Sequence, residues 1–194
     1  MAKKSKTWLW VVGVLVIVAL LLFSWVKGTY NSLVTLDESV RNAQAEIENQ
    51  LQRRYDLIPN YVETVKGYAS HEKEVLEEIT RARSRIGSAP TLKEKLQAND
   101  QLNSALARLL VVVENYPNLK ANENFIRLQD ELAGTENRIA VARRRYNQAV
   151  QVYNRRIRSF PTNILAGMFG FQQKPYFEAP KAAQQAPKVD FKTR

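Results

Sequence analysis

The apolar run near the N-terminus constrains the fold of this chain more than any other feature. It extends from Trp8 to Val26, reads WLWVVGVLVIVALLLFSWV and carries no charge. A helix of about 19 residues is roughly 28 Å long, which is close to the hydrocarbon thickness of a bilayer. All three tryptophans lie at its ends, as in the aromatic belts of membrane interfaces. The run therefore predicts a single transmembrane helix.

The alternative interpretation is a cleaved signal peptide, which would have a shorter apolar part followed by a small-x-small cleavage site. The stretch FSWVK at residues 23–27 offers no such site, so we expect an uncleaved anchor. Lys3, Lys4 and Lys6 precede the run, whereas Lys27 alone follows closely. The excess of lysine predicts a cytoplasmic N-terminus with the remaining residues outside, and the small margin leaves the reverse orientation possible.

Helical periodicity dominates the rest of the chain. Apolar side chains recur every three or four residues up to a turn signal at IGSAPT, residues 86–91. A second helix is predicted from the capping box Thr91–Glu94 to the turn NYPN at residues 115–118. A third begins after the cap Asn122 and ends at Phe160-Pro161. The seam of the first helix comprises Val40, Gln44, Ile47, Leu51, Tyr55, Ile58, Val62, Val65, Ala69, Glu72, Leu76 and Ile79.

Short loops between long helices imply antiparallel neighbours. We therefore predict an all-α fold, in which an N-terminal transmembrane helix is followed by an elongated antiparallel helical bundle of three to four helices. The predicted divisions are 1–28 for the cytoplasmic lysines and anchor, 29–159 for the bundle, 160–177 for an apolar aromatic segment and 178–194 for a disordered tail.

The stretch LQRRYDLIPNYVETVKGY, residues 51–68, places a proline inside a helical stripe. The stripe keeps its phase on both sides of Pro59, which predicts a kinked but continuous helix with the carbonyl of Tyr55 open to a polar partner. The polar residues around the kink either solvate and pin it or form a protein-contact surface. The candidate interaction surface is Arg53, Arg54, Asp56, Pro59 and Asn60.

The segment 160–177 is rich in aromatic and aliphatic side chains, too many to stay exposed on a soluble monomer. Its candidate docking residues are Ile164, Met168, Phe169 and Phe171. We expect this segment to pack against protein, in the same chain or a second copy, with Met168 and Phe169 buried against helix seams. Contact with a bilayer interface is the alternative.

Known catalytic and metal-binding patterns are missing. The chain has no cysteine and one histidine, His71, and Val75 stands where a zinc-protease helix needs its second histidine. No phosphate-binding loop and no serine elbow appear. We therefore expect no catalytic, cofactor-binding or metal site and no enzyme activity; a carboxylate-based hydrolase is the remaining enzymatic alternative.

The net charge of +10 includes arginine clusters at residues 143–145 and 155–158. Nucleic acid is not an expected partner, because no nucleic-acid-binding module accompanies them. Anionic lipid, an acidic partner or a solvated helix face explains them better. The pairs Tyr146-Asn147 and Tyr153-Asn154 are predicted to set the register between helices through a buried amide.

Several motifs resemble the LemA family of bacterial membrane-anchored helical proteins. The matching stretches are Tyr30-Asn31, IENQLQRRYDLIPN at 47–60, VETVKGY at 62–68, Tyr116-Pro117, Phe125, residues 131–136, Arg143 to Asn147, Tyr153-Asn154 and Phe160-Pro161 onward. The resemblance implies one N-terminal membrane helix and a helical bundle, but no activity. It also implies a short N-terminus facing outside, opposite to the orientation that the lysines predict.

These features together predict a non-catalytic scaffold or protein-interaction module in the bacterial cytoplasmic membrane. We expect it to meet the lipid bilayer through its N-terminal helix and to form a homo-oligomer. An unidentified membrane protein is a possible further partner. The alternative function is an accessory or regulator of a membrane protease or of an envelope stress response.

Overall fold

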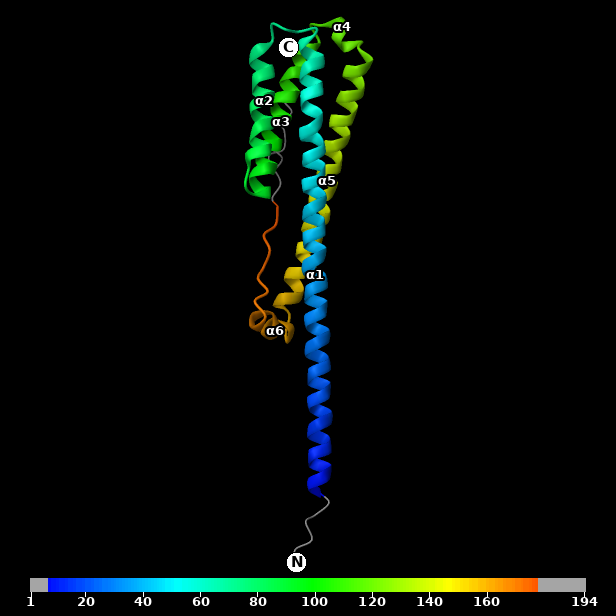
Figure 1. Cartoon of the computed structure of the whole chain (residues 1–194), viewed down its shortest axis with the longest axis vertical. Coiled ribbons are helices and arrows are strands. Elements are labelled where there is room, and N and C mark those ends of the chain that lie inside the picture. The colour runs from blue at the N-terminus through cyan, green and yellow to red at the C-terminus, as the bar shows by residue number, and fades with distance from the viewer. Residues whose placement is uncertain (1–6, 178–194) are drawn as a thin grey trace, which may run out of the picture. The chain divides into compact units, whose positions relative to one another are not determined.

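A computed structural model describes residues 7–177 and contains six helices in that range (Figure 1). They are α1 (Thr7–Lys66), α2 (Lys73–Ser88), α3 (Leu92–Val113), α4 (Pro117–Lys120), α5 (Glu123–Arg158) and α6 (Thr162–Met168). The described residues carry no strand, which confirms the predicted all-α class. The chain divides into two compact units, and α1 and α5 each contribute to both.

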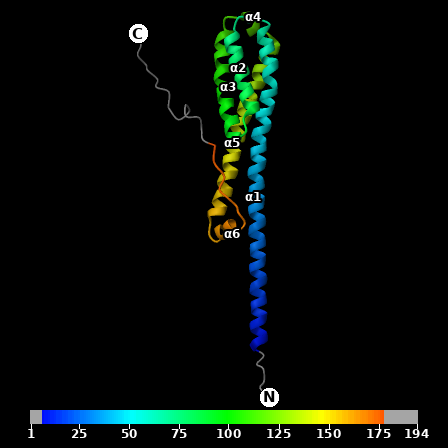
Figure 2. The same cartoon turned by 60° about the vertical axis from the view of Figure 1, so that its left-hand side comes forward.

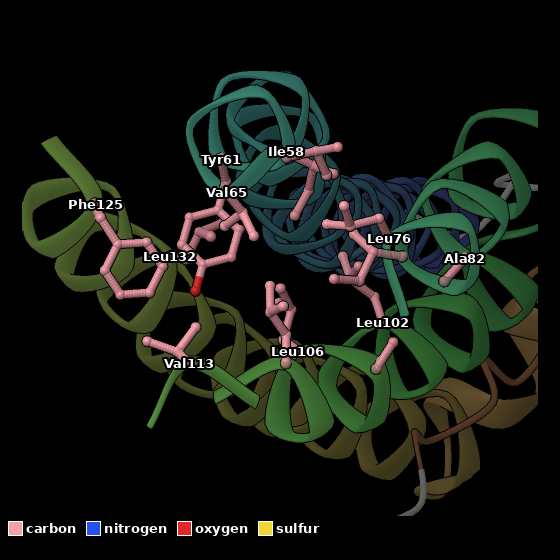
Figure 3. Packing of buried hydrophobic residues seen from close by; sticks show 14 of the residues in the cluster. Ile58, Tyr61, Val65, Leu76, Ala82, Leu102, Leu106, Val113, Phe125 and Leu132 are labelled. Atoms are coloured by element: carbon pink, nitrogen blue, oxygen red, sulfur yellow. The ribbon is translucent and has the colours of Figure 1, made fainter. Parts of the chain in front are cut away.

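The first unit, here called the bundle unit, comprises Ala43–Arg145 and, of the described residues that follow, Tyr176 and Phe177. The C-terminal part of α1, then α2, α3 and the N-terminal part of α5 lie side by side, and each successive helix reverses direction (Figures 1 and 2). Apolar side chains from all four meet in its interior (Figure 3). The rings of Tyr61 and Phe125 stack there with centroids 5.2 Å apart. This is the arrangement that short loops between amphipathic helices predict.

The prediction of one unbroken helix up to IGSAPT was wrong. The chain leaves the helix at Gly67, reverses, and starts α2 at Lys73. Tyr68 and Ala69 both donate backbone N–H bonds to the carbonyl of Val65, which closes the end of α1. The apolar phase continued across the break because both helices line one core. Periodicity therefore could not reveal the reversal.

Two predicted helix starts are confirmed by their caps. The hydroxyl of Thr91 accepts a bond of 3.2 Å from the backbone N–H of Glu94 at the start of α3. The side chain of Asn122 accepts a bond of 2.9 Å from the N–H of Phe125 at the start of α5. Each cap satisfies a backbone donor that the first helical turn leaves without a partner.

The second unit, here called the anchor unit, comprises the described residues up to Asn42 together with Tyr146–Pro175. Within it the end of α5 runs antiparallel to α1, and α6 lies beside α1 (Figures 1 and 2). Its interior is small and includes Leu33, Val150, Tyr153, Ile157 and Leu165. The apolar part of α1 that precedes Leu33 is long enough to cross a membrane, and none of it is buried.

Candidate functional site

A buried polar network lies inside the bundle unit, centred on Arg54. The side chain of Arg54 is 3% exposed. Its guanidinium donates to the carboxylate of Glu136 and to the amide oxygens of Asn99, at 2.9 Å, and Asn103. Asn99 also donates to Glu136 at 3.1 Å. Three helices, α1, α3 and α5, are thus tied together by one charged side chain.

Burial lowers the pKa of the Arg54 guanidinium, and the charge of nearby Glu136 partly offsets this effect. A buried charge of this kind is tolerated only when it is paired and hydrogen-bonded. The side chain of Glu136 is 33% exposed, and the Nε–H of Arg54 is buried without a hydrogen-bond partner. The arrangement of the network suits specification of helix order and register.

The sequence placed Arg54 in a candidate interaction surface, and the structure places it in the interior instead. The other four members lie at the surface of the bundle unit. Arg53 is exposed and pairs with Glu131 at 2.6 Å, and Asp56 accepts a bond from Gln52 at 2.9 Å. Pro59 is half-buried and Asn60 is exposed.

The expected polar partner at Pro59 is present. Helix α1 continues through Pro59, which confirms the predicted continuity. The proline has no N–H to offer the carbonyl of Tyr55. Arg83 of α2 donates its Nε–H to that carbonyl at 3.0 Å, and its guanidinium lies over the Tyr55 ring at 3.8 Å from the centroid. A Cβ on Gly87 would come within 3.0 Å of the same ring, so glycine allows the close approach of α2.

The C-terminal aromatic segment is held within the anchor unit by a paired backbone contact. The amide of Asn154 donates to the carbonyl of Lys174 at 2.8 Å and accepts from its N–H at 2.9 Å. The ammonium of Lys174 pairs with Asp37 of α1 at 2.9 Å. The hydroxyl of Tyr146 donates to the carbonyl of Pro175 at 3.2 Å. Asn154 therefore holds the segment that follows α6, whereas the sequence predicted that Asn154 would set the register between two helices.

The four candidate docking residues differ in how far they contact the rest of the chain. Phe169 and Phe171 approach the ring of Tyr30 edge-on, at centroid distances of 4.9 and 5.9 Å. Ile164 and Met168 remain exposed on α6, and Phe169 also stays substantially exposed. Met168 and Phe169 are therefore not buried within this chain, and their burial against a second copy stays a prediction. The segment does pack against its own chain, but mainly through Leu165, Ala166 and Phe171.

The described surface offers one larger hollow, an open groove of about 600 Å³ beside the α1–α2 turn. It is lined by Lys66, Ser70, Lys73, Leu76, Glu77, Thr80 and Arg81. Three of its six polar side chains, those of Lys66, Lys73 and Arg81, are cationic. Among residues 7–177, no three His, Asp or Glu side chains are grouped to hold a metal ion.

Sequence reasoning missed Asn99, Glu136, Arg83 and the role of Asn154. A signal for the first two did exist. Asn99 lies three residues after Leu96, and Glu136 lies four after Leu132, so both fall on apolar stripes. Arg54 likewise lies three after Leu51 and four before Ile58. Polar residues at core positions of several helices in one bundle predict a shared interior network.

Comparisons with known proteins place the chain in a family. The chain is 29% identical over 196 residues to magnetosome protein MamQ 2 of Paramagnetospirillum magneticum, covering 88% of this chain and 71% of that protein. It is 27% identical over 153 residues to protein LemA of Metamycoplasma hominis, covering 78% and 70%. Magnetosome protein MamQ of Magnetospirillum gryphiswaldense is 25% identical over 174 residues, covering 76% and 64%. The LemA family model matches residues 43–191, which include all of Ala43–Arg145, and the chain belongs to the LemA family.

Proposed function

We propose that this chain is a non-catalytic, membrane-anchored interaction module that assembles with copies of itself at the bacterial cytoplasmic membrane. One observation carries the proposal: α1 is a single uninterrupted helix over Thr7–Lys66. The same helix therefore supplies the candidate membrane span and one wall of the bundle core, with no non-helical linker between them. A chain built in this way keeps a folded protein surface attached to a bilayer.

Chemistry of the described residues supports an interaction role. The buried guanidinium of Arg54 bonds to Glu136 and to two asparagines, an arrangement that holds three helices together. The names of the relatives state no reaction either: two are named for the magnetosome and one for LemA.

The bundle unit exposes aliphatic side chains on α3. Leu110 and Val111 are neighbours in the chain and both are exposed, Val111 to 72%. We propose these two side chains as the contact between copies, with Arg53, Asp56, Pro59 and Asn60 as a second candidate surface for a different partner.

Cysteine crosslinking in intact membranes tests self-assembly, because the chain has no cysteine of its own. Val111→Cys should give a product of twice the chain mass with a short bifunctional thiol reagent. Ser84→Cys, at an exposed position of α2, is the matched control and should give little. Equal crosslinking at both positions, or none at Val111→Cys, contradicts the proposed contact.

An accessory role for another membrane protein is the competing function. Affinity purification from detergent-solubilised membranes, read by mass spectrometry, separates the two. Recovery of the chain with itself alone supports the scaffold. Recovery of one defined protein in constant proportion, with no self-association, supports the accessory role.

The orientation is proposed from the lysines: N-terminus in the cytoplasm and bundle unit outside. Protease added to intact spheroplasts should then digest the bundle unit. Protection in spheroplasts, with digestion only after lysis, shows the reverse orientation.

A further inference from the structure

The exposed apolar side chains at the C-terminal end of the anchor unit form a distinct group. Phe160 is 81% exposed, Met168 72% and Ile164 54%. Ile164 and Met168 lie four residues apart on α6, so they share one face of that helix. Leu165 and Ala166 on its other side are buried against the unit. Helix α6 thus presents an apolar face that nothing in the described chain covers.

The level of α6 along α1 is fixed by aromatic contacts. Phe169 follows α6 directly and meets the ring of Tyr30 at 4.9 Å. Tyr30 lies four residues beyond Val26, the last residue of the apolar run. At 1.5 Å per residue this is about 6 Å along the helix. The headgroup layer on each side of a bilayer is about 5–7 Å thick, so Tyr30 and Phe169 fall within it when the apolar run fills the hydrocarbon.

Charges in the same unit suit that layer. Lys27 follows the apolar run, and Arg155, Arg156 and Arg158 occupy the last turn of α5, immediately before α6. All four are exposed. Cations next to an exposed apolar face are typical of segments that lie in the interface of a membrane with anionic lipids. No acidic residue occurs between residues 156 and 177.

The geometry points to a second membrane contact: α6, with Phe160, Ile164 and Met168, lies in the interfacial layer of the same bilayer that α1 spans. This inference rests on the membrane anchor of the proposed function but not on self-assembly. Figures 1 and 2 show the same placement within the anchor unit, with α6 beside α1 at the end of α5 and the apolar run continuing past it. Docking of α6 between copies of the chain is the competing outcome.

The contact has a structural consequence. Asn154 and Asp37 hold the chain after α6 through the backbone and the ammonium of Lys174. The polar contacts therefore face the protein and leave the apolar face of α6 directed outward. The segment 160–175 acts as a strap that attaches the end of α5 to the membrane surface.

Site-specific fluorescence tests the contact, and the absence of native cysteine allows one label per chain. Full-length Met168→Cys is labelled with an environment-sensitive nitrobenzoxadiazole probe and reconstituted in vesicles of phosphatidylcholine and phosphatidylglycerol. Doxyl-labelled lipids then quench the probe at known depths. Ser84→Cys, at an exposed position of α2 in the bundle unit, is the control; Val18→Cys, within the apolar run, reports insertion of the anchor.

We expect blue-shifted emission at position 168 and quenching by shallow doxyl lipids several-fold stronger than at position 84. Position 18 should be quenched best by deep doxyl lipids. Adding Phe160→Ser and Ile164→Ser should reduce the shallow quenching at position 168 while leaving thermal unfolding unchanged, because both side chains are exposed.

Three results would overturn the inference. Water-like emission at position 168 with deep quenching at position 18 shows that α6 avoids the bilayer although the anchor inserts. Blue-shifted emission at position 168 without doxyl quenching shows a protein contact between copies. Water-like emission at positions 168 and 18 rejects both the membrane anchor and the α6 contact.

Discussion

The two ends of α1 use apolar residues in opposite ways. Residues 8–26 are apolar around the whole helix, and all of those from Trp8 to Trp25 are exposed. Residues 43–66 place apolar side chains on one stripe, and Ile47, Leu51, Ile58 and Val65 are almost completely buried. A helix that is apolar all round requires an apolar solvent, whereas a striped helix requires neighbouring helices.

The difference also governs where polar groups are found. The apolar run holds no charge, whereas the striped part carries Arg54 into the bundle interior and supplies it with a carboxylate and two amides. Protein neighbours can offer hydrogen bonds to a buried charge, and lipid tails cannot. Charge substitutions at the two ends of α1 should therefore fail for different reasons.

The largest effect is expected from breaking the bundle network. Arg54→Ala leaves Glu136 and the buried Asn99 without their shared donor, and removal of one partner of a buried ion pair costs about 3–5 kcal/mol. The free energy of unfolding, measured by urea titration of the full chain in detergent, should fall by about that amount. Arg53→Ala removes an exposed ion pair next to it and should cost at most about 1 kcal/mol. Equal losses for both variants would contradict the central role of Arg54.

A charge in the apolar run should instead affect membrane insertion. Leu15→Arg places a cation near the middle of the run, which costs about 2.5–3.5 kcal/mol on insertion scales. The fraction of protein retained in membranes after alkaline carbonate extraction should fall. Ser84→Arg adds the same charge at an exposed position in the bundle unit and should leave retention unchanged. Full retention of Leu15→Arg would show that the run is not a transmembrane helix.

The fold was largely predictable because two periodic signals are strong. An uninterrupted apolar run and long three-four stripes predicted the anchor and the amphipathic helices, and capping chemistry located the starts at Thr91 and Asn122. The reversal at residues 67–72 was not predictable from phase, because Val65 and Leu76 line one core from opposite directions. Gly67 alone did not distinguish a turn from a tolerated helical glycine.

The polar contacts were harder to predict. Pro59 has no N–H, so the sequence predicted that the carbonyl of Tyr55 lacks its helical partner; this follows from backbone chemistry alone. Its partner Arg83 lies 28 residues away and becomes a neighbour only through the reversal. The placement of Arg54 was missed because arginine is usually exposed, and only its coincidence with polar core positions on other helices reveals the network.

A double-mutant cycle tests the contact at Pro59, with a smaller expected effect. Arg83→Met keeps the aliphatic stem and removes the donor to Tyr55, so a partly buried carbonyl loses its bond at a cost of about 1–2 kcal/mol. Pro59→Ala supplies a helical N–H to the same carbonyl. In that background Arg83→Met should cost about 1 kcal/mol less, as measured by urea unfolding. Additive effects of the two substitutions would show that Arg83 acts only through stacking on the Tyr55 ring.

The smallest effect at neutral pH, and one visible only in alkali, concerns Tyr61. Burial raises its pKa, because the phenolate would lose hydration in the apolar core beside Phe125. In the unfolded chain the phenol ionises near pH 10. Below that pH the protonated group contributes its full stability. As pH rises through the unfolded pKa toward the raised folded one, stability falls by up to about 1.4 kcal/mol per pH unit.

Tyr61→Phe should therefore flatten the decline of unfolding free energy between about pH 10 and 12, with little change at pH 7. Urea unfolding of the full chain in detergent, repeated across that range, measures the slope. Tyr68→Phe, at an exposed position just beyond α1, is the matched control and should decline as the original chain does. The free energy of unfolding would then depend on the protonation of Tyr61, which lies in the part of α1 that lines the bundle core. An unchanged slope in Tyr61→Phe would mean that other buried tyrosines, such as Tyr146 and Tyr153, dominate the alkaline response; burial raises the pKa of both.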